Sequence, residues 1–287
     1  MSAKLNIHSL LCHQHLEMGL LCLGSLLKFS SLPLQLIIHD DGSLTSEDIE
    51  KLKKGLKDVK IVLRAEADEL TNQLLKRHPN CYKFRYENVL GLKLLDIPLF
   101  SQGDIAYCDS DVLFFRPFDG MFCWPNSETS ALFMMDYQQA YSIRPWHLLG
   151  INNLRIPSKV NTGIMFIRNK AYDLDFIEWI LGNDRLKQIF RKIPGWAEQT
   201  CWAALGFKVG CRLWHPQQIA MIHPGINLTD HLVAGHFIST YRFLLKNFSS
   251  NASIQANSNA VKVNTIQTEK CSILKLGLSQ LNRKINR

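Results

Sequence analysis

Two aspartates with one residue between them, Asp109 and Asp111, follow an apolar run at 105–108 and precede a second one at 112–115. We expect the first run to be a buried strand, and in an extended chain residues i and i+2 point to the same side. Two carboxylates that converge at a strand end repel each other unless a cation lies between them. Mg²⁺ or Mn²⁺ prefers such oxygens, often together with phosphate oxygens. The spacing therefore predicts a metal site that holds a phosphorylated ligand. The alternative is a solvated turn or helix cap, which the buried segments on both sides disfavour.

A second acidic pair, Asp40 and Asp41, follows the apolar run at 34–39. Ligands of parallel α/β sheets bind beyond the carboxyl ends of the strands, so at least one of these aspartates is a candidate for contact with a ligand. The alternative is a structural turn through Gly42, with Thr45 or its neighbour capping the next helix.

Two expected helices carry polar residues that could face the same ligand. Lys93 lies on a helix expected at 88–95, just before the first aspartate strand, where it could contact a phosphate or a ribose. Glu198 and Gln199 lie in the first turn of a helix expected at 196–205, close to the positive end of its dipole. An ordinary solvated charge is the alternative for the lysine, and ordinary capping is the alternative for the other two.

The apolar strand expected at 160–168 begins with polar residues. Asn161 and Thr162 can present an amide and a hydroxyl group, and Gly163 lets a ligand or another backbone approach closely.

Four histidines, at 215, 223, 231 and 236, follow one another in a stretch that contains Pro and Gly. Their spacing fits no zinc signature, so most of them are expected to be structural or exposed. His236 lies in an apolar run at 235–238 that is typical of a strand returning to the sheet. We expect it to be a third metal ligand.

The order of the apolar runs predicts an α/β fold. A strand at 5–11, a helix at 15–29 and a strand at 34–39 have the spacing of a parallel crossover unit. Other elements are expected as helices at 47–56, 66–78 and 173–181 and as strands at 60–63, 129–135 and 208–213. The stretch 142–158 has no clear period and is expected to be a functional loop.

The net charge of +8 is unevenly distributed along the 287 residues. Residues 249–287 carry a charge of +5 and residues 1–248 only +3. We therefore expect residues 1–248 to form one domain in which positive and negative charges nearly balance, without a nucleic-acid-binding face. Residues 249–287 are expected to form a polar linker over 250–267 and a basic tail, with a short amphipathic helix at 270–285. That helix could contact an anionic membrane surface, or it could remain solvated.

The eight cysteines form no CxxC pair, and several lie in apolar runs, which indicates free thiols in a reducing compartment. The first residues lack the pattern of a signal peptide, and no uncharged run reaches the length of a membrane span. We therefore expect a cytoplasmic protein, with contact at the inner membrane surface through the tail.

In the order of these motifs the chain resembles glycosyltransferases of the GT-A fold, most of all the family 8 type and related small bacterial nucleotide-sugar transferases. The apolar strand that runs into Asp109-Ser110-Asp111 is similar to the DxD motif, and Asn161-Thr162-Gly163 is similar to the donor-sugar motif N-[AST]-G. Glu198-Gln199 stands where family 8 has Asp-Gln, and His236-Phe237 stands where it has its late metal-binding histidine. Asp40-Asp41-Gly42-Ser43 is similar to the nucleoside-binding stretch of family 2.

One expected motif differs. The Gly-x-x-Lys-Pro-Trp that follows the late histidine in family 8 is absent, and Arg242 is our candidate for the lysine that contacts the diphosphate there. The glutamate at 198, where an aspartate is expected, leaves the acceptor-side chemistry open.

The resemblance implies a GT-A fold, a mixed and mainly parallel sheet flanked by helices. It implies a hexosyltransferase that uses a nucleotide-diphosphate sugar, foremost a UDP-sugar. It favours retention of the sugar's configuration, while inversion stays open with Glu198 as the candidate base. Mn²⁺ or Mg²⁺ would be held by Asp109, Asp111 and His236. The nucleotide sugar would contact the residues Asp40, Asp41, Lys93, Ser110, Asn161, Thr162, Gly163 and Arg242, and the catalytic positions would be Glu198 and Gln199.

Two alternatives remain at this point. A non-catalytic protein that binds a nucleotide sugar or a glycan could keep the same fold. An aspartate-nucleophile phosphatase of the haloacid dehalogenase type shares the pattern Asp-x-Asp after an apolar strand. Such phosphatases place it near the N-terminus and need a later acidic pair, for which Asp173 and Asp175 are poor candidates because they open a helix.

Overall fold

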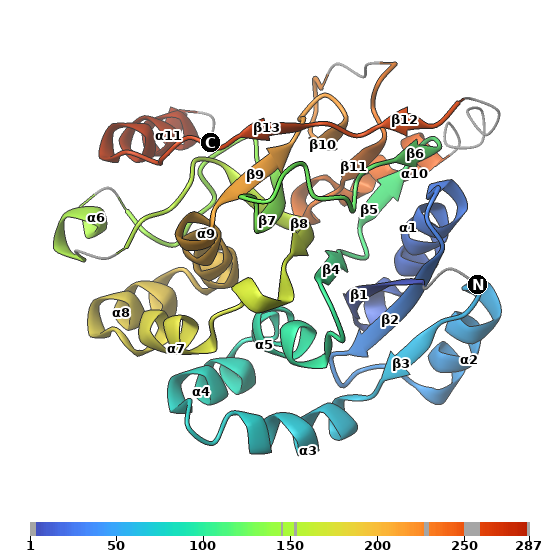
Figure 1. The fold of residues 1–287 in the computed structure, drawn as a ribbon, viewed down its shortest axis with the longest axis horizontal. Helices are drawn as coiled ribbons and strands as arrows, with labels where there is room; N and C mark the ends of the chain where they lie inside the picture. Colours follow the sequence, from blue (N-terminus) through green and yellow to red (C-terminus); the bar gives the residue numbers. More distant parts are fainter. Residues whose placement is uncertain (1–3, 145, 152–153, 227–229, 250–258, 286–287) are drawn as a thin grey trace.

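A computed structural model describes residues 4–144, 146–151, 154–226, 230–249 and 259–285. Its centre is one mixed sheet with helices on both sides (Figure 1). The sheet order is β13 (Thr265–Gln267), β9 (Cys211–Trp214), β7 (Ala131–Met135), β8 (Val160–Ile167), β4 (Ile105–Cys108), β1 (Leu5–Leu11), β2 (Leu34–Asp40) and β3 (Lys60–Val62). The pairs β1–β2, β2–β3, β1–β4 and β7–β9 are parallel, and the remaining pairs are antiparallel. The sheet is thus the mixed, mainly parallel α/β sheet that the sequence predicts.

The first crossover unit forms as predicted. Strand β1 is followed by the short helix η1 (His13–His15) and by α1 (Leu16–Phe29), and β2 returns parallel to β1. Helix α2 (Ser46–Gly55) then begins at a capping box, in which Thr45 and Asp48 bond each other's backbone N–H groups. This geometry confirms the predicted cap. The parallel pairing of β1 and β2 brings their carboxyl ends to one edge of the sheet.

Three helices, α3 (Arg64–Leu74), α4 (Pro79–Glu87) and α5 (Leu90–Phe100), lead from β3 into β4. The guanidinium of Arg85 is fully buried between them and donates to both carboxylate oxygens of Asp96 at 2.7 Å. Burial of such a pair requires this full hydrogen bonding. The pair joins α4 to α5, the helix that carries Lys93.

The chain leaves the main sheet directly after β4. Strand β5 (Val112–Phe114) joins β10 (Ile219–Met221) and β11 (Ala234–His236) in a second small sheet. In its antiparallel register His236 lies opposite Val112. Val112 and His236, which are far apart in sequence, are therefore neighbours in this second sheet.

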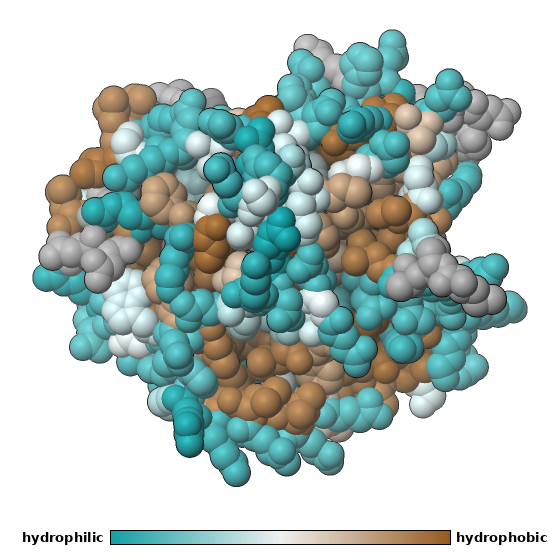
Figure 2. Space-filling view, viewed as in Figure 1, coloured by the Kyte–Doolittle hydropathy of each residue, from teal (hydrophilic) through white to brown (hydrophobic). Residues whose placement is uncertain are grey.

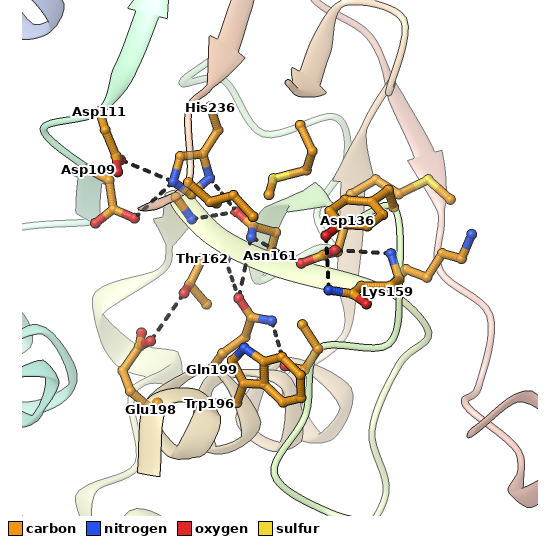
Figure 3. Close-up of a pocket in the computed structure, with 18 of the residues that line it drawn as sticks. Asp109, Asp111, Asp136, Lys159, Asn161, Thr162, Trp196, Glu198, Gln199 and His236 are labelled. Carbon is orange, nitrogen blue, oxygen red and sulfur yellow. Dashed lines mark hydrogen bonds and ion pairs between the residues drawn. The ribbon is translucent and has the colours of Figure 1, made fainter. Parts of the chain in front are cut away.

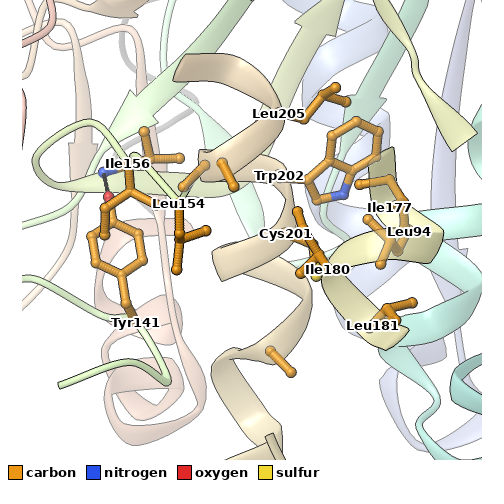
Figure 4. Close-up of a cluster of buried hydrophobic side chains, with 14 of the residues drawn as sticks. Leu94, Tyr141, Leu154, Ile156, Ile177, Ile180, Leu181, Cys201, Trp202 and Leu205 are labelled. Atoms are coloured by element: carbon orange, nitrogen blue, oxygen red, sulfur yellow. Dashed lines mark hydrogen bonds between the residues drawn. The ribbon is translucent and has the colours of Figure 1, made fainter. Parts of the chain in front are cut away.

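A helical layer of α7 (Leu174–Gly182), α8 (Asp184–Lys192) and α9 (Ala197–Val209) covers the other part of the sheet. Short η2 (Asn169–Ala171) and η3 (Pro194–Trp196) connect these elements. Trp202 on α9 is fully buried among apolar side chains of α5 and α7, which Figure 4 shows around it. This packing holds the N-terminal end of α9 toward the sheet.

Several boundaries differ from the sequence expectation: α3 ends at Leu74 and not at residue 78, α4 is an additional helix, and α5 continues through Pro98 to Phe100 instead of ending at residue 95. Residues 208 and 209 belong to α9 and not to a strand, because the helix continues until Gly210, whose φ of +85° ends it before β9. The predicted loop 142–158 contains the short helix α6 (His147–Gly150), and its residues 145, 152 and 153 lie outside the described residues.

The C-terminal segment adds structure to the body. Strand β12 (Val261–Lys262) pairs with β6 (Phe118–Asp119), and β13 pairs with β9, so residues 261–262 and 265–267 are strands and not the linker that the sequence predicts. Residues 250–258 of that predicted linker lie outside the described residues. Helix α11 (Ile273–Ile285) forms as predicted, after η4 (Ser239–Leu244) and α10 (Leu245–Ser249). The domain boundary at residue 248 stays a prediction.

Apolar side chains gather over α11 and α6 at the upper left of Figure 2. The exposed ones on α11 are Ile273, Leu274, Leu278 and Leu281. Among the described residues, no helix has both the length and the apolar character that crossing a bilayer requires. All eight cysteines are described and are free thiols, as predicted.

Candidate functional site

A cavity of about 1330 Å³ opens beyond the ends of β1, β4 and β8. It is lined by predicted site residues from both halves of the chain: Asp41, Lys93, Asp109, Ser110, Asp111, Asn161, Thr162, Gly163, Glu198, Gln199, His236 and Arg242. Figure 3 shows how several of these side chains point toward one another. Asp40 is the one predicted residue that does not line it within the described residues.

The two aspartates converge through a turn rather than through an extended strand. Asp109 N–H donates to the carbonyl of Gly163 at 2.7 Å, and Val112 N–H donates back to the carbonyl of Asp109 at 3.3 Å. The carbonyl of Asp111 accepts from Phe237 N–H at 2.9 Å. The expected extended geometry is therefore wrong, but the expected outcome, two carboxylates on one side, is present.

Asp109, Asp111 and His236 form a cluster whose candidate ligand atoms all lie within 4.8 Å of one another. Nε2 of His236 is 3.1 Å from Asp111 Oδ1 and 3.7 Å from Asp109 Oδ2. Two carboxylates and one imidazole suit a divalent cation such as Mn²⁺, and their mutual distances leave one ion in reach of all three. The donor set thus fits the predicted metal.

Charge pairing outweighs burial within this cluster. Burial alone would raise the pKa of Asp111, but His236 and Arg242 hold that pKa at about 2. Burial would lower the pKa of His236, but Asp111 raises it overall. The cluster is therefore strongly polarised, with a fixed negative charge on Asp111.

The ring of His236 is held from behind. Its Nδ1 is 3.0 Å from Oδ1 of Asn161, which leaves Nε2 directed at the two aspartates. A Cβ on Gly163 would lie 2.6 Å from Cε1 of the ring and still closer to Nδ1. Gly163 therefore makes room for the histidine, which is a more specific role than the close approach that the sequence predicts.

Lys93 is buried and lies between two carboxylates. Its Nζ donates to both oxygens of Asp109 at 3.1 Å and lies 3.9 Å from Glu198 Oε1. Burial lowers the pKa of Lys93, but Asp109 and Glu198 outweigh it and raise the pKa overall. Its geometry is that of a counter-charge for the strand-end carboxylates, and its predicted contact with a phosphate or ribose stays a prediction.

The amide and carboxyl groups of α9 reach the start of β8. Oε1 of Gln199 is 3.4 Å from Nδ2 of Asn161, and that same Nδ2 donates to Asp136 at 3.2 Å. Oε2 of Glu198 accepts from Thr162 Oγ1 at 3.3 Å. Glu198 Oε1 is buried without a hydrogen-bond partner among the described residues. Burial raises the pKa of Glu198 to about 7, against the opposing effect of Lys93.

The acidic pair after β2 has divided roles. Asp40 Oδ1 accepts from the N–H groups of Gly42 and Leu44 at 2.8 and 3.0 Å, so this carboxylate closes the turn. Asp41 bonds Ser43 and lines the cavity. Of the two, Asp41 is thus the one placed to meet a ligand.

Sequence reasoning missed three residues at this site. Tyr107 donates its hydroxyl to Asp109 at 2.5 Å, and His15 Nε2 is 2.8 Å from Nη1 of Arg242. Asp136, directly after β7, accepts from Nδ2 of Asn161 at 3.2 Å. The available signal was the position of Tyr107 two residues before Asp109, which is the spacing of side chains on one side of an extended segment.

Comparison of the sequence with models of protein families finds no match, and comparison with curated proteins finds none either. Comparison of the fold finds solved glycosyltransferases. Mouse xyloside xylosyltransferase 1 has a TM-score of 0.54 at 11% identity over 83% of this chain and 99% of that structure. The galactosyltransferase LgtC, solved with donor and acceptor sugar analogues, has 0.53 at 11% identity over 89% and 98%. GlyE of Streptococcus pneumoniae has 0.54 at 13% identity over 89% of this chain but only 62% of that structure.

At identities this low, the similarity to these structures shows a shared fold and no more. The chain therefore has the GT-A fold that its motifs predict.

Proposed function

We propose that the protein is a metal-dependent hexosyltransferase that moves a sugar from a nucleotide-diphosphate sugar, foremost a UDP-sugar, to a glycan, lipid or other acceptor. The observation that carries this proposal is the convergence of Asp109, Asp111 and His236 at a strand end inside a large polar cavity. Ligands of open α/β sheets bind at this edge. The solved structures of the same fold add that it suits sugar transfer.

Departure of the nucleoside diphosphate builds negative charge on the β-phosphate, and the enzyme must stabilise that charge. Asp109, Asp111 and His236 would hold Mn²⁺ or Mg²⁺, which supplies Lewis-acid stabilisation of the leaving group. The Arg242 guanidinium, which is one-third exposed and turned into the cavity, would add a second positive charge beside the diphosphate. Asp41, with Lys93 behind Asp109, would complete the nucleotide side, and Ser110 lines the same wall.

The donor sugar would lie on the opposite wall. Asn161, Thr162 and Gly163 line the cavity there, and Glu198 and Gln199 face them from the first turn of α9. Glu198 and Gln199, in the first turn of α9 at the positive end of its dipole, are the catalytic positions of this proposal, and this choice rests on the resemblance to family 8. Retention of configuration is part of the proposal and rests on the resemblance to family 8.

The phosphatase alternative lacks support at its second acidic pair. Asp173 accepts from Phe176 N–H at 2.8 Å as the cap of α7, and Asp175 bonds His78 at 2.8 Å. Neither residue lines the cavity that holds Asp109.

We also propose a cytoplasmic location with contact to an anionic membrane surface through α11. Its exposed residues Leu274, Leu278 and Leu281 lie at the helical spacing of one stripe on a segment of net positive charge. Sedimentation with vesicles that contain anionic lipid tests this. Leu274→Glu should reduce the bound fraction, whereas Leu70→Glu on α3 should not.

A thermal-shift panel tests the central proposal. Nucleotide diphosphates and nucleotide sugars are added with and without Mn²⁺ to the wild type, to Asp111→Asn and to Asp119→Asn, an exposed aspartate outside the cavity. A ligand at 100 times its Kd stabilises a fold by about 2.7 kcal/mol. We expect a Mn²⁺-dependent shift with one nucleotide that Asp111→Asn abolishes and Asp119→Asn keeps. No shift with any nucleotide, or a full shift in Asp111→Asn, would overturn the proposal, and turnover with the bound donor then separates an enzyme from a binding protein.

A further inference from the structure

A second cavity, of about 470 Å³, lies between helix α8 and the chain segment that contributes Ser142, Arg144, Trp146 and His147. Its volume is within the ~300–1,000 Å³ that is usual for small-molecule sites. The segment contributes Arg144, Trp146 and His147, and α8 contributes Arg185, Gln188 and Lys192. None of these side chains belongs to the site described above.

The charged groups of this second cavity share one sign. Arg144, Arg185 and Lys192 line it, and its described lining includes no aspartate or glutamate. Arg185 and Lys192 are seven residues apart on α8, which places them on one face of the helix. A hollow lined by one sign of charge concentrates the potential and attracts the opposite charge.

His147 adds a neutral donor to these cations. Burial, and then Arg144 and Lys192, lower the pKa of His147, so the ring is uncharged near neutral pH. Its Nδ1 accepts from the backbone N–H of Arg144 at 2.8 Å, which leaves the proton on Nε2 as a donor. Trp146, whose side chain is 61% exposed, offers a ring face at the same place.

The two cavities share a wall. Ala140, Gly195 and Trp196 line the first cavity, whereas Ser142 and Ile193, two residues away on the same two segments, line the second. The wall is cross-linked, because Ser142 Oγ donates to the carbonyl of Ile193 at 2.6 Å and Ser142 N–H donates to Thr200 Oγ1 at 3.0 Å. The neighbouring Gln199, a proposed catalytic residue, donates to the carbonyl of Ala140 at 2.8 Å. The second cavity therefore lies next to the catalytic residues, on the other side of this wall.

We propose that the second cavity binds an anionic group, a phosphate, sulfate or carboxylate, that is carried by the glycan acceptor. This inference rests on the proposed glycosyltransferase function, since it supplies the acceptor subsite of that reaction. The guanidinium of Arg144 suits the paired oxygens of such a group, and Lys192 adds a point charge. Trp146 packs against the sugar ring that carries the anion, so that the anion and the ring are recognised together.

Calorimetric titration tests the proposal with four probes: a hexose 6-phosphate, a hexuronate, the uncharged hexose and inorganic phosphate. We expect the two anionic sugars to bind more tightly than the hexose or phosphate alone. The double variant Arg144→Gln/Lys192→Gln should weaken their binding about tenfold or more, as expected for lost charge-assisted hydrogen bonds. The matched double variant Lys187→Gln/Arg191→Gln, on parts of α8 that do not line the cavity, should bind as the wild type does.

Other outcomes separate the sources of binding. Trp146→Ala should remove the advantage of the sugar phosphate over inorganic phosphate, and equal affinity for the two in the wild type would overturn the acceptor assignment. Affinity that survives Arg144→Gln/Lys192→Gln but is lost in Asp111→Asn would place the anion in the first cavity and overturn the inference. The nucleotide thermal shift is measured on the same samples. Its absence alone refutes the proposed function, whereas a normal nucleotide shift without sugar-phosphate binding refutes this inference alone.

Discussion

Arg242 donates two hydrogen bonds to one oxygen of Asp111, from Nε at 3.0 Å and from Nη2 at 2.7 Å. The same guanidinium contacts His15 with Nη1. Asp111 is a candidate metal ligand, so its contact with Arg242 has two consequences. The guanidinium stabilises the ionised carboxylate, and in the proposed function it would also contact the diphosphate.

Arg242→Gln should therefore separate binding of metal from binding of the nucleotide. We expect the affinity for the nucleoside diphosphate in Mn²⁺ to fall about tenfold, because one charge-assisted contact is lost. The affinity for Mn²⁺ alone should stay equal or increase, because Asp111 loses a competing cation. Calorimetric titration with each ligand measures both quantities.

Arg191→Gln is the matched control, since it removes an equal charge from the exposed surface of α8. An unchanged nucleotide affinity in Arg242→Gln would show that Arg242 only holds Asp111 and does not contact the diphosphate.

Gly163→Ala should damage the metal site without removing any ligand. The new methyl group would overlap the ring of His236 and would lie 3.0 Å from Oδ1 of Asn161, so the imidazole must move away from the two aspartates. Changes in the groups that orient a metal ligand typically cost about 10–100-fold in metal affinity. Titration of the variant with Mn²⁺ measures the loss.

Gly195→Ala controls for the substitution itself. Gly195 also lines the cavity, but a Cβ there would have no neighbour within 4 Å. Equal Mn²⁺ affinity in the two variants would mean that the position of the His236 ring is irrelevant to the metal.

The raised pKa of Glu198 predicts how stability depends on pH. Burial raises this pKa from 4.5 to about 7 in the folded protein. Between these values the folded state binds more protons than the unfolded chain, so Glu198 makes the free energy of unfolding fall as the pH rises from about 4.5 through 7. Glu198→Gln removes this loss. Its stability relative to the wild type should rise by roughly 3 kcal/mol between pH 4.5 and pH 8.

Urea denaturation of both proteins across this range measures the difference, with exposed Glu66→Gln on α3 as the control. A difference that does not change with pH would mean that Glu198 titrates at an ordinary pKa.

Local patterns in the sequence were sufficient for the elements that have a clear period. The unit β1–α1–β2 follows from alternating apolar runs and Pro33, and the cap at Thr45 follows from residue type. The cluster of Asp109, Asp111 and His236 was predictable because the two aspartates stand between two apolar runs and His236 lies within a third. Carboxylates and an imidazole in such places have few structural uses.

Contacts between distant segments left no local signal. His15 and Arg242 are 227 residues apart, and only the folded chain brings them together. Residues 265–267 end a stretch rich in Ser, Asn and Gln that predicts a linker, yet they pair with β9 as an edge strand, where one face and one edge remain in solvent. The end of α9 was misplaced because Lys208 and Val209 fit either a helix or a strand, and only the backbone of Gly210 decides between them.

Trp202 should be the most costly single truncation in the layer that carries the catalytic helix. Its side chain is fully buried on α9, against Tyr172 at a ring distance of 5.7 Å and the apolar residues in Figure 4. Trp202→Ala leaves a cavity of indole size and should lower the free energy of unfolding by about 3–5 kcal/mol in urea denaturation.

Trp146→Ala removes the same side chain from an exposed position, so its effect should stay within about 0.5 kcal/mol. The indole N–H of Trp202 has no hydrogen-bond partner among the described residues, so the cost in Trp202→Ala reflects packing and not a lost hydrogen bond. Trp202→Phe keeps most of that packing and should recover more than half of the loss. If Trp202→Phe were as unstable as Trp202→Ala, the nitrogen would have to bind a group such as a buried water, and the packing explanation would be wrong.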